Sequence, residues 1–244
     1  MVNSIEITTN KWFEETVLKI NGKVTSDTPV DNLLSGIVPV TYNYCNAVFV
    51  LANANCRLPA MAILRILGEL AMKTIWCIYK DNPRKESHNV RILRWLKETN
   101  KEEIKLLKKV LPSANQEDAV EIQQTIDYLQ REIDNNSHPF MGSFYNSLDE
   151  LPPTYKKDIY PILYGAFNRA IHPNLKLFGD LVKQEGKKRT FLSDLDIDLQ
   201  ALKLYSMTAA FNILTIVRVY YEWDYKCMKS EYLAIKKKLA DGKR

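Results

Sequence analysis

Three charged residues, Arg65, Glu69 and Lys73, recur every fourth residue in a segment, Met61 to Tyr79, that is otherwise apolar almost all round. At a helical period of about 3.6 residues per turn, they form one stripe on a helix whose other faces suit burial. A charge withdrawn from water needs a partner, because an unpaired buried charge is costly. We therefore expect this stripe to face a polar centre.

A second polar row supplies the best partner. Tyr164, Asn168 and His172 share the same spacing, and Arg169 stands beside them on a neighbouring line. His172 occupies the last turn of the expected helix, where the helix dipole favours the imidazolium form. A general acid or a phosphate-binding cation needs that direction of shift. The two rows together form the candidate site.

The same residues also fit a structural role. His172 can cap its own helix, Asn168 can satisfy a backbone group, and Arg65 can pair with Glu69 along one helix. Such arrangements are more common than active sites, although ionic groups on so apolar a helix favour a use beyond stability, because desolvation can exceed the Coulomb gain. Both interpretations stay open.

Other polar residues are more typical of structure. Arg218 and Glu222 have the spacing of a second ion pair, which could join the polar centre or bridge the surface. His88 and His138 lie in charged or Pro-rich segments, where we expect them to be solvated.

The composition favours one large helical domain or two small ones. The chain has 244 residues, 46% of them hydrophobic, and only 8 glycines, and its apolar residues recur mainly at helical spacing. The net charge of +5 gathers in lysine-rich clusters, which are more typical of solvated helix ends than of phosphate sites. Nucleic acid is permitted by this charge but not indicated.

Cysteine and motif patterns exclude several classes of protein. The 4 cysteines are far apart, with neither a C-x-x-C pair nor a Cys/His cluster, and the first residues lack a signal-peptide pattern. We expect a cytoplasmic protein without a metal or another cofactor. Polar residues interrupt the uncharged run Leu33 to Cys56, so no membrane span is expected. Motifs for nucleotide binding, zinc peptidases and serine hydrolases are absent from the sequence.

Helical periodicity predicts the elements that must position the site. The expected bundle helices lie near residues 36–56, 58–80, 155–172 and 198–239. Near the start, residues 10–20 read as a short helix ended by Asn21-Gly22, although that pair could instead turn a hairpin. Residues 23–35 read as a loop, and Pro59 suits either a first helical turn or a kink.

Residues 84–135 differ in character. Segments 90–99, 101–111 and 115–135 are amphipathic and densely charged, with Pro112 separating the last two. They predict peripheral helices. We therefore expect a single domain, 1–244, in which 84–135 is a helical-hairpin insertion.

Two short strings carry a resemblance. The string Ile63–Leu70, followed later by Tyr164–Pro173, resembles an uncharacterised family of bacterial helical proteins that pairs an R-x-x-x-E helix with a Y-x-x-x-S-x-x-x-H-P helix. The two strings also resemble, more distantly, the HEPN superfamily of helical bundles, whose nuclease members carry an Arg and a His near the end of one helix. The resemblance covers about a tenth of the chain, and its motifs are short.

Residue by residue, the resemblance marks Arg65, Glu69, Tyr164 and His172, while Asn168 stands where the first family usually has Ser. HEPN nucleases have four to six residues between Arg and His, whereas two residues separate Arg169 from His172. The similar enzymes imply metal-independent RNA cleavage, in which a ribose 2′-hydroxyl attacks the phosphate, His172 exchanges a proton and Arg169 or Arg65 stabilises the phosphorane charge.

The resemblance further implies that the protein is a toxin or an antiphage defence effector. Such a protein would form a homodimer and bind RNA, a protein partner or an antitoxin. The residues alone leave two alternatives. One is a non-catalytic helical module with a structural polar core, whose charged helices bind a protein partner. The other is a sensor with a closed pocket, in which the arginines hold a carboxylate or phosphate ligand.

Overall fold

The computed structural model describes residues 2–23, 28–79, 81, 83–161, 182–185, 188–191 and 198–241. It shows an all-α helical bundle, as the sequence predicts. Among the described residues, the only strands are β1 (Val182–Glu185) and β2 (Lys188–Phe191), which pair antiparallel with Val182 opposite Phe191.

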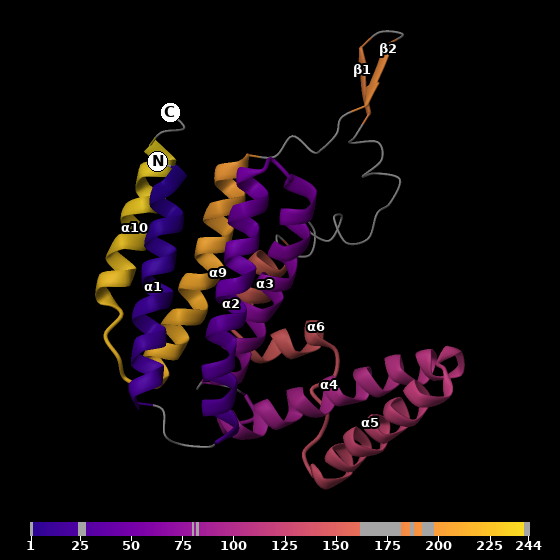
Figure 1. Ribbon diagram of the computed structural model, residues 1–244. Coiled ribbons are helices and arrows are strands. Elements are labelled where there is room, and N and C mark those ends of the chain that lie inside the picture. Colours follow the sequence, from indigo (N-terminus) through magenta and orange to yellow (C-terminus); the bar gives the residue numbers. More distant parts are fainter. Residues whose placement is uncertain are drawn as a thin grey trace.

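Within the described residues, five long helices build the bundle: α1 (Val2–Lys23), α2 (Pro29–Asn53), α3 (Arg57–Ile78), α9 (Leu199–Tyr220) and α10 (Lys226–Asp241). Helix α9 packs against α1, α2 and α3, and α2 also packs against α3 (Figure 1). Helix α10 lies beside α1 at the side of the bundle (Figure 1). Helix α9 is therefore central, and α3, which carries the ionic stripe, is one of its neighbours.

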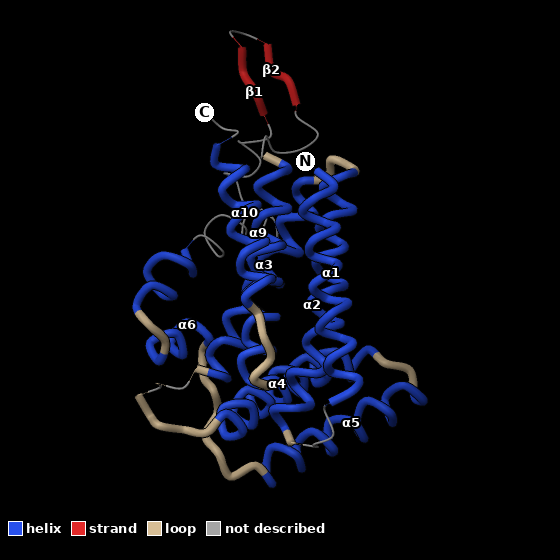
Figure 2. The backbone as a smooth tube through the Cα atoms, turned by 90° about the vertical axis from the view of Figure 1, so that its left-hand side faces the viewer, coloured by secondary structure: helices blue, strands red, loops and turns tan. Residues whose placement is uncertain are grey.

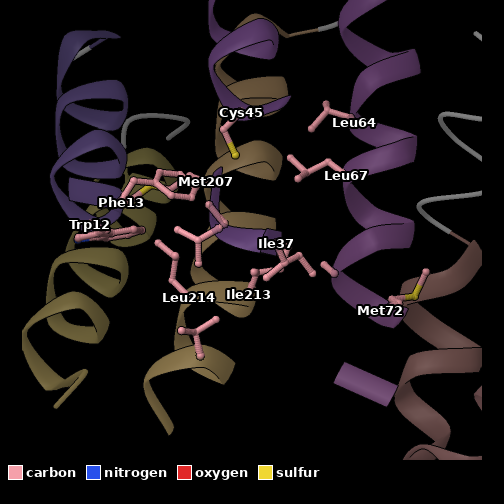
Figure 3. Packing of buried hydrophobic residues seen from close by; sticks show 14 of the residues in the cluster. Trp12, Phe13, Ile37, Cys45, Leu64, Leu67, Met72, Met207, Ile213 and Leu214 are labelled. Atoms are coloured by element: carbon pink, nitrogen blue, oxygen red, sulfur yellow. The ribbon is translucent and has the colours of Figure 1, made fainter. Parts of the chain in front are cut away.

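The core consists of apolar side chains that several helices contribute. Figure 3 shows Trp12 and Phe13 from α1, Leu67 from α3, and Met207 and Leu214 from α9 in one interior. Each of these side chains is at most 2% exposed. Burial of a large apolar side chain contributes about 1.5–3 kcal/mol, so this core is the main force that holds the helices together.

Helices α2 and α9 are long and apolar enough to cross a membrane, by length and composition alone. The sequence predicts no span for the run Leu33 to Cys56, most of which lies in α2, because polar residues interrupt it. In the structure, 39% of the apolar window of α2 and 56% of that of α9 are buried, and the two helices pack against each other. Core helices of globular proteins meet the same criterion.

The first two helices are longer than the sequence predicts. The N-terminal segment is helical, as favoured over the hairpin, but α1 spans Val2–Lys23. Part of the predicted loop 23–35 is also helix, because the hydroxyl of Thr28 accepts a hydrogen bond from the amide of Asp31 and Pro29 opens α2. Helix α2 then ends at Asn53, where Asn55 adopts a φ of 60°.

The prediction of a single helix over 198–239 is wrong. Helix α9 ends at Tyr220, and a separate helix, α10, begins at Lys226. Glu222 adopts a φ of 57°, and the amide of Trp223 donates to the carbonyl of Arg218 at 2.7 Å. This is a Schellman ending formed without glycine, which the sequence pattern does not reveal. Pro59, in contrast, lies in the first turn of α3, one of the two predicted alternatives.

The charged segment forms a helical hairpin. Helix α4 (His88–Val110) is one continuous helix over the segments 90–99 and 101–111, which were predicted separately. A 3-10 turn at Leu111–Ser113 connects it to α5 (Gln116–Asn135). Both views place this hairpin at the end of the bundle away from the chain termini (Figures 1 and 2). It contains its own small apolar cluster, Ile104, Ile126, Leu129 and Ile133. Its status as an insertion stays a prediction.

Candidate functional site

The ionic stripe of α3 forms a connected row. Nη2 of Arg65 lies 3.4 Å from Oε2 of Glu69, and Nζ of Lys73 lies 2.7 Å from Oε1 of the same carboxylate. The three side chains are only 20–22% exposed. One carboxylate therefore joins two cations, and the group of three side chains carries a net charge of +1 in a largely buried position. The ion pair between Arg65 and Glu69 confirms the predicted pairing of these two residues.

Aromatic side chains cover this row. Nζ of Lys73 lies 5.6 Å from the ring centre of Trp95 on α4 and 5.4 Å from that of Phe144, which opens the short helix α6 (Phe144–Ser147). Cations are attracted to ring faces at such distances. The row thus faces α4 and the chain that follows the hairpin, whereas the opposite face of α3 packs into the bundle core.

Tyr160 extends the cover towards Arg65 and Glu69. Its ring lies 5.2 Å from that of Tyr145 and 6.4 Å from that of Phe144. Burial raises the pKa of Tyr160, the charge of Glu69 raises it further, and Arg65 opposes the shift. The Tyr160 hydroxyl therefore stays protonated near neutral pH and can donate a hydrogen bond beside the row.

The other half of the predicted site lies outside the described residues. Tyr164, Asn168, Arg169 and His172 belong to the segment 162–181. The helix predicted over 155–172 is described only at its start, where Tyr155–Ile159 is a π-helical turn. The structure thus brings Arg65 and Glu69 together, and the meeting of this pair with His172 stays a prediction.

A second polar centre, which the sequence analysis missed, lies at the end of α3. Arg91 and Arg94 on α4 are buried, each at most 1% exposed as a residue, and both guanidinium groups lie 5.3–5.4 Å from the ring centre of Trp76. Nη1 of Arg91 donates to the carbonyl of Trp76, one of the last carbonyls of α3, which lack partners within the helix. Arg91 therefore caps α3.

Carboxylates complete this centre. Glu150 accepts from Nε1 of Trp76 at 2.9 Å and lies 3.7 Å from Nη2 of Arg94, while Arg94 also binds Glu86. Burial lowers the pKa of Arg91, although Glu150 opposes the shift. Among the described residues, Nε and Nη2 of Arg91 have no hydrogen-bond partner. The sequence shows only densely charged helices here, so no pattern distinguishes these arginines from surface ones.

Arg218 does not pair with Glu222, which corrects the sequence prediction. The guanidinium group is buried and binds α1 instead: Nη2 donates to the hydroxyl of Thr16 at 3.0 Å and lies 3.3 Å from Oε2 of Glu15. Glu222 lies beyond the end of α9 in the turn to α10. The residues at this joint come from opposite ends of the chain, so sequence spacing could not reveal them.

His88 also differs from its prediction. Instead of being fully solvated, it is half-buried at the start of α4, and its ring lies 5.8 Å from that of Tyr220 on α9. It lines a groove together with Tyr79 and Glu222. This places one histidine at the joint of three helices, remote in sequence from the other candidate residues.

The described row combines two cations with one carboxylate, a set that suits anion binding. Arg65 and Lys73 can attract a phosphate, and Glu69 between them holds both cations in place. In the part of the chain that the structure describes, no three His, Cys, Asp or Glu side chains converge as a metal site requires. Burial raises the pKa of Cys77, which Arg91 and Lys73 oppose, so this thiol remains protonated.

The chain belongs to a protein family defined by sequence. A family model, described as the Family of unknown function (DUF5677), matches residues 31–189. This range begins in α2, includes the ionic row and the hairpin, and extends across the predicted second half of the site. Neither the curated proteins nor the solved structures contain a match to the chain.

Proposed function

We propose that this member of the DUF5677 family is a HEPN-like, metal-independent endoribonuclease that acts as a bacterial toxin or antiphage effector. The observation that supports the proposal most is the row Arg65–Glu69–Lys73, which is about four-fifths covered and stands on a core helix. Buried ion pairs are a poor source of stability, since desolvation opposes them. A use in binding and chemistry explains their presence better.

In the proposed reaction, a ribose 2′-oxygen attacks the adjacent phosphorus and the 5′-oxygen of the next nucleotide leaves. His172 exchanges a proton with the reacting oxygens, and Arg169 or Arg65 stabilises the negative charge of the phosphorane. Glu69 holds Arg65 in place, and Tyr164 and Asn168 orient the RNA. The products are a 2′,3′-cyclic phosphate and a free 5′-hydroxyl. A cytoplasmic homodimer is part of this proposal.

The test is cleavage of end-labelled RNA by the full chain in the presence of EDTA. We expect His172→Ala to reduce the rate by about 100-fold or more, because general acid–base catalysis contributes at least that factor. Arg65→Ala should have a similar effect, whereas Arg65→Lys should retain part of the activity. Arg131→Ala, on an exposed part of α5, is the control. Equal cleavage by the parent and the His172→Ala protein, or a parent that cleaves only with added metal, contradicts the proposal.

A second function, protein interaction without catalysis, is favoured by the α4–α5 hairpin. It has an apolar cluster separate from the bundle core, and its exposed surface combines many charged side chains with apolar ones such as Leu106 and Val120. A bundle that is only a scaffold would leave RNA intact and still bind a partner through this hairpin. The RNA-cleavage measurement therefore separates the two functions.

A further inference from the structure

A groove on the α4–α5 hairpin combines a basic rim with an apolar floor. It has a volume of about 510 Å³ and lies between the C-terminal half of α4, the end of α5 and Phe140. Ile104 and Ile133 form its floor and are 6% and 9% exposed. Such a combination is typical of a surface that binds an amphipathic segment.

Four lysines of α4 form the rim: Lys101, Lys105, Lys108 and Lys109. Their spacing keeps them on one side of the helix, over a length of about 12 Å at 1.5 Å per residue. Glu98 pairs with Lys101 at 2.8 Å, and Glu102 pairs with Lys105 at 3.4 Å. Within the described ranges, no carboxylate oxygen lies within 4 Å of the ammonium groups of Lys108 and Lys109. The rim therefore keeps an excess of positive charge.

Phe140 forms one end of the groove and is 38% exposed. The ammonium groups of Lys97 and Lys101 lie 4.9 Å and 5.0 Å from its ring centre. These contacts hold the ring and the two lysines together. An exposed aromatic side chain next to lysines offers both apolar contact and charge to a bound segment.

The loop segment that carries Phe140 is held against α4 by hydrogen bonds. Nζ of Lys97 donates to the carbonyl of Asn136 at 2.6 Å and to that of His138 at 3.0 Å. The amide of Met141 donates to the carbonyl of Arg94 at 3.3 Å, and the amide of Gly142 donates to Glu98 at 3.2 Å. The wall of the groove is therefore formed before any partner binds, which lowers the entropic cost of binding.

The charge distribution distinguishes between two kinds of partner. Residues 88–135 contain nine carboxylate side chains and eight Lys or Arg side chains, so the hairpin as a whole is not basic. A nucleic acid needs a basic surface that follows its phosphates, whereas here the basic edge is short and lies beside the acidic helix α5. Two to three turns of an acidic helix match both the length of the rim and its apolar floor.

We infer that this groove binds an acidic amphipathic helix of a partner protein. Acidic side chains of the partner pair with the four lysines, and its apolar side chains contact Ile104, Ile133 and Phe140. This inference specifies the partner for the interaction role of the hairpin, and it holds whether or not the bundle cleaves RNA.

The experiment is a selection of binding peptides from a random 18-residue library displayed on phage, with the full chain as the target. Peptides that also bind the variant Lys101→Ser/Lys105→Ser/Lys108→Ser/Lys109→Ser are removed. We expect the remaining peptides to be rich in Asp and Glu, with apolar residues three and four positions apart. Fluorescence anisotropy then measures one labelled peptide, with an unlabelled uridine homopolymer as competitor.

We expect the four-lysine variant to bind the peptide about thirtyfold more weakly than the parent, since each exposed ionic contact is worth a fraction of a kcal/mol. Phe140→Ser, which leaves the charge unchanged, should weaken binding severalfold. The charge-matched control is Lys229→Ser/Lys236→Ser/Lys237→Ser/Lys238→Ser on α10, which should bind like the parent. Selected peptides without acidic residues, no peptide that depends on the lysines, or displacement by RNA through the same lysines overturns the inference.

Discussion

The bundle and the α4–α5 hairpin use charged side chains in different ways. In the bundle, Lys203 and Arg218 of α9 are 1% and 2% exposed, and each binds side chains of another helix. On the hairpin, Lys105 and Glu102 are 61% and 53% exposed and pair within a single helix. A charge therefore joins two helices where neighbouring helices enclose it, and it stays largely exposed to water where none does.

The joints of the bundle connect distant parts of the chain. Nζ of Lys203 donates to Oε1 of Glu6 at 2.6 Å and also binds Asn53, so it ties α9 to α1 and α2. Arg218 ties α9 to α1 about four turns further along α9. These bonds specify how the helices align, because a shift along the helix axis would leave buried polar groups without partners.

The largest expected effect tests the joint at Arg218. Arg218→Ala should lower the free energy of unfolding by about 3 kcal/mol, because it removes several hydrogen bonds to a buried charged group and leaves Thr16 and the carbonyl of Trp12 without this donor. Chemical denaturation followed by circular dichroism measures the change. Arg131→Ala on the hairpin, an exposed arginine, should change it by less than about 0.5 kcal/mol. If both variants lowered the free energy of unfolding equally, the enclosed charges of the bundle would not differ from the exposed charges of the hairpin in their contribution to stability.

A smaller effect is expected in the hairpin cluster. Ile126→Ala should destabilise the hairpin by about 2 kcal/mol, at the low end for such a change, because few residues surround Ile126. Hydrogen exchange should show faster amide exchange in α5 and in the second half of α4, with α3 and α9 unchanged. If exchange in α9 accelerates as much as in α5, the hairpin and the bundle unfold as one unit, and the distinction between them fails.

The smallest effect concerns acid stability at the contact of α1 with α10. Hydrogen bonds from Lys11 and then from Trp12 lower the pKa of Glu231 below its ordinary value. The stabilisation is therefore present above the unfolded-state pKa of about 4.3, and it is lost as the pH falls through the lower pKa of the folded protein. Glu231→Gln should be less stable than the parent near pH 7, and this difference should shrink below about pH 4.

Thermal unfolding of both proteins from pH 7 to pH 3 measures this difference. Glu102→Gln on the hairpin is the control, since its exposed pair with Lys105 contributes little. A difference between the Glu231→Gln protein and the parent that stays constant over this range would show that the carboxylate charge does not stabilise the α1–α10 contact.

Much of the helical pattern could be predicted, because periodicity reports which residues face a core. Helix α3 was expected over 58–80 and spans 57–78, and the apolar face of α9 is buried, with Leu202 and Ile213 fully enclosed. Helix ends were predicted less well. The αL residues Asn55 and Glu222 end α2 and α9 through backbone hydrogen bonds, and such endings have a weak sequence signal when glycine is absent.

The candidate site was predictable only in part. The pair of Arg65 and Glu69 follows from the four-residue spacing on one helix, because i and i+4 side chains are neighbours there. The buried Arg91 and Arg94 were missed, because their partners Trp76 and Glu150 lie on other elements. A charged side chain in an amphipathic segment has the same sequence appearance whether it lies in solvent or is enclosed.

By itself, the sequence determined that the chain is mainly helical, which faces of its core helices are apolar, and that Arg65, Glu69 and Lys73 share one line, since these properties depend on near neighbours along the chain. Only the tertiary structure decided which charges are enclosed. Arg218 against α1, Arg91 against the end of α3, and the lysines around the floor of Ile104 and Ile133 all depend on contacts between remote segments, and periodicity within one helix carries no information about them.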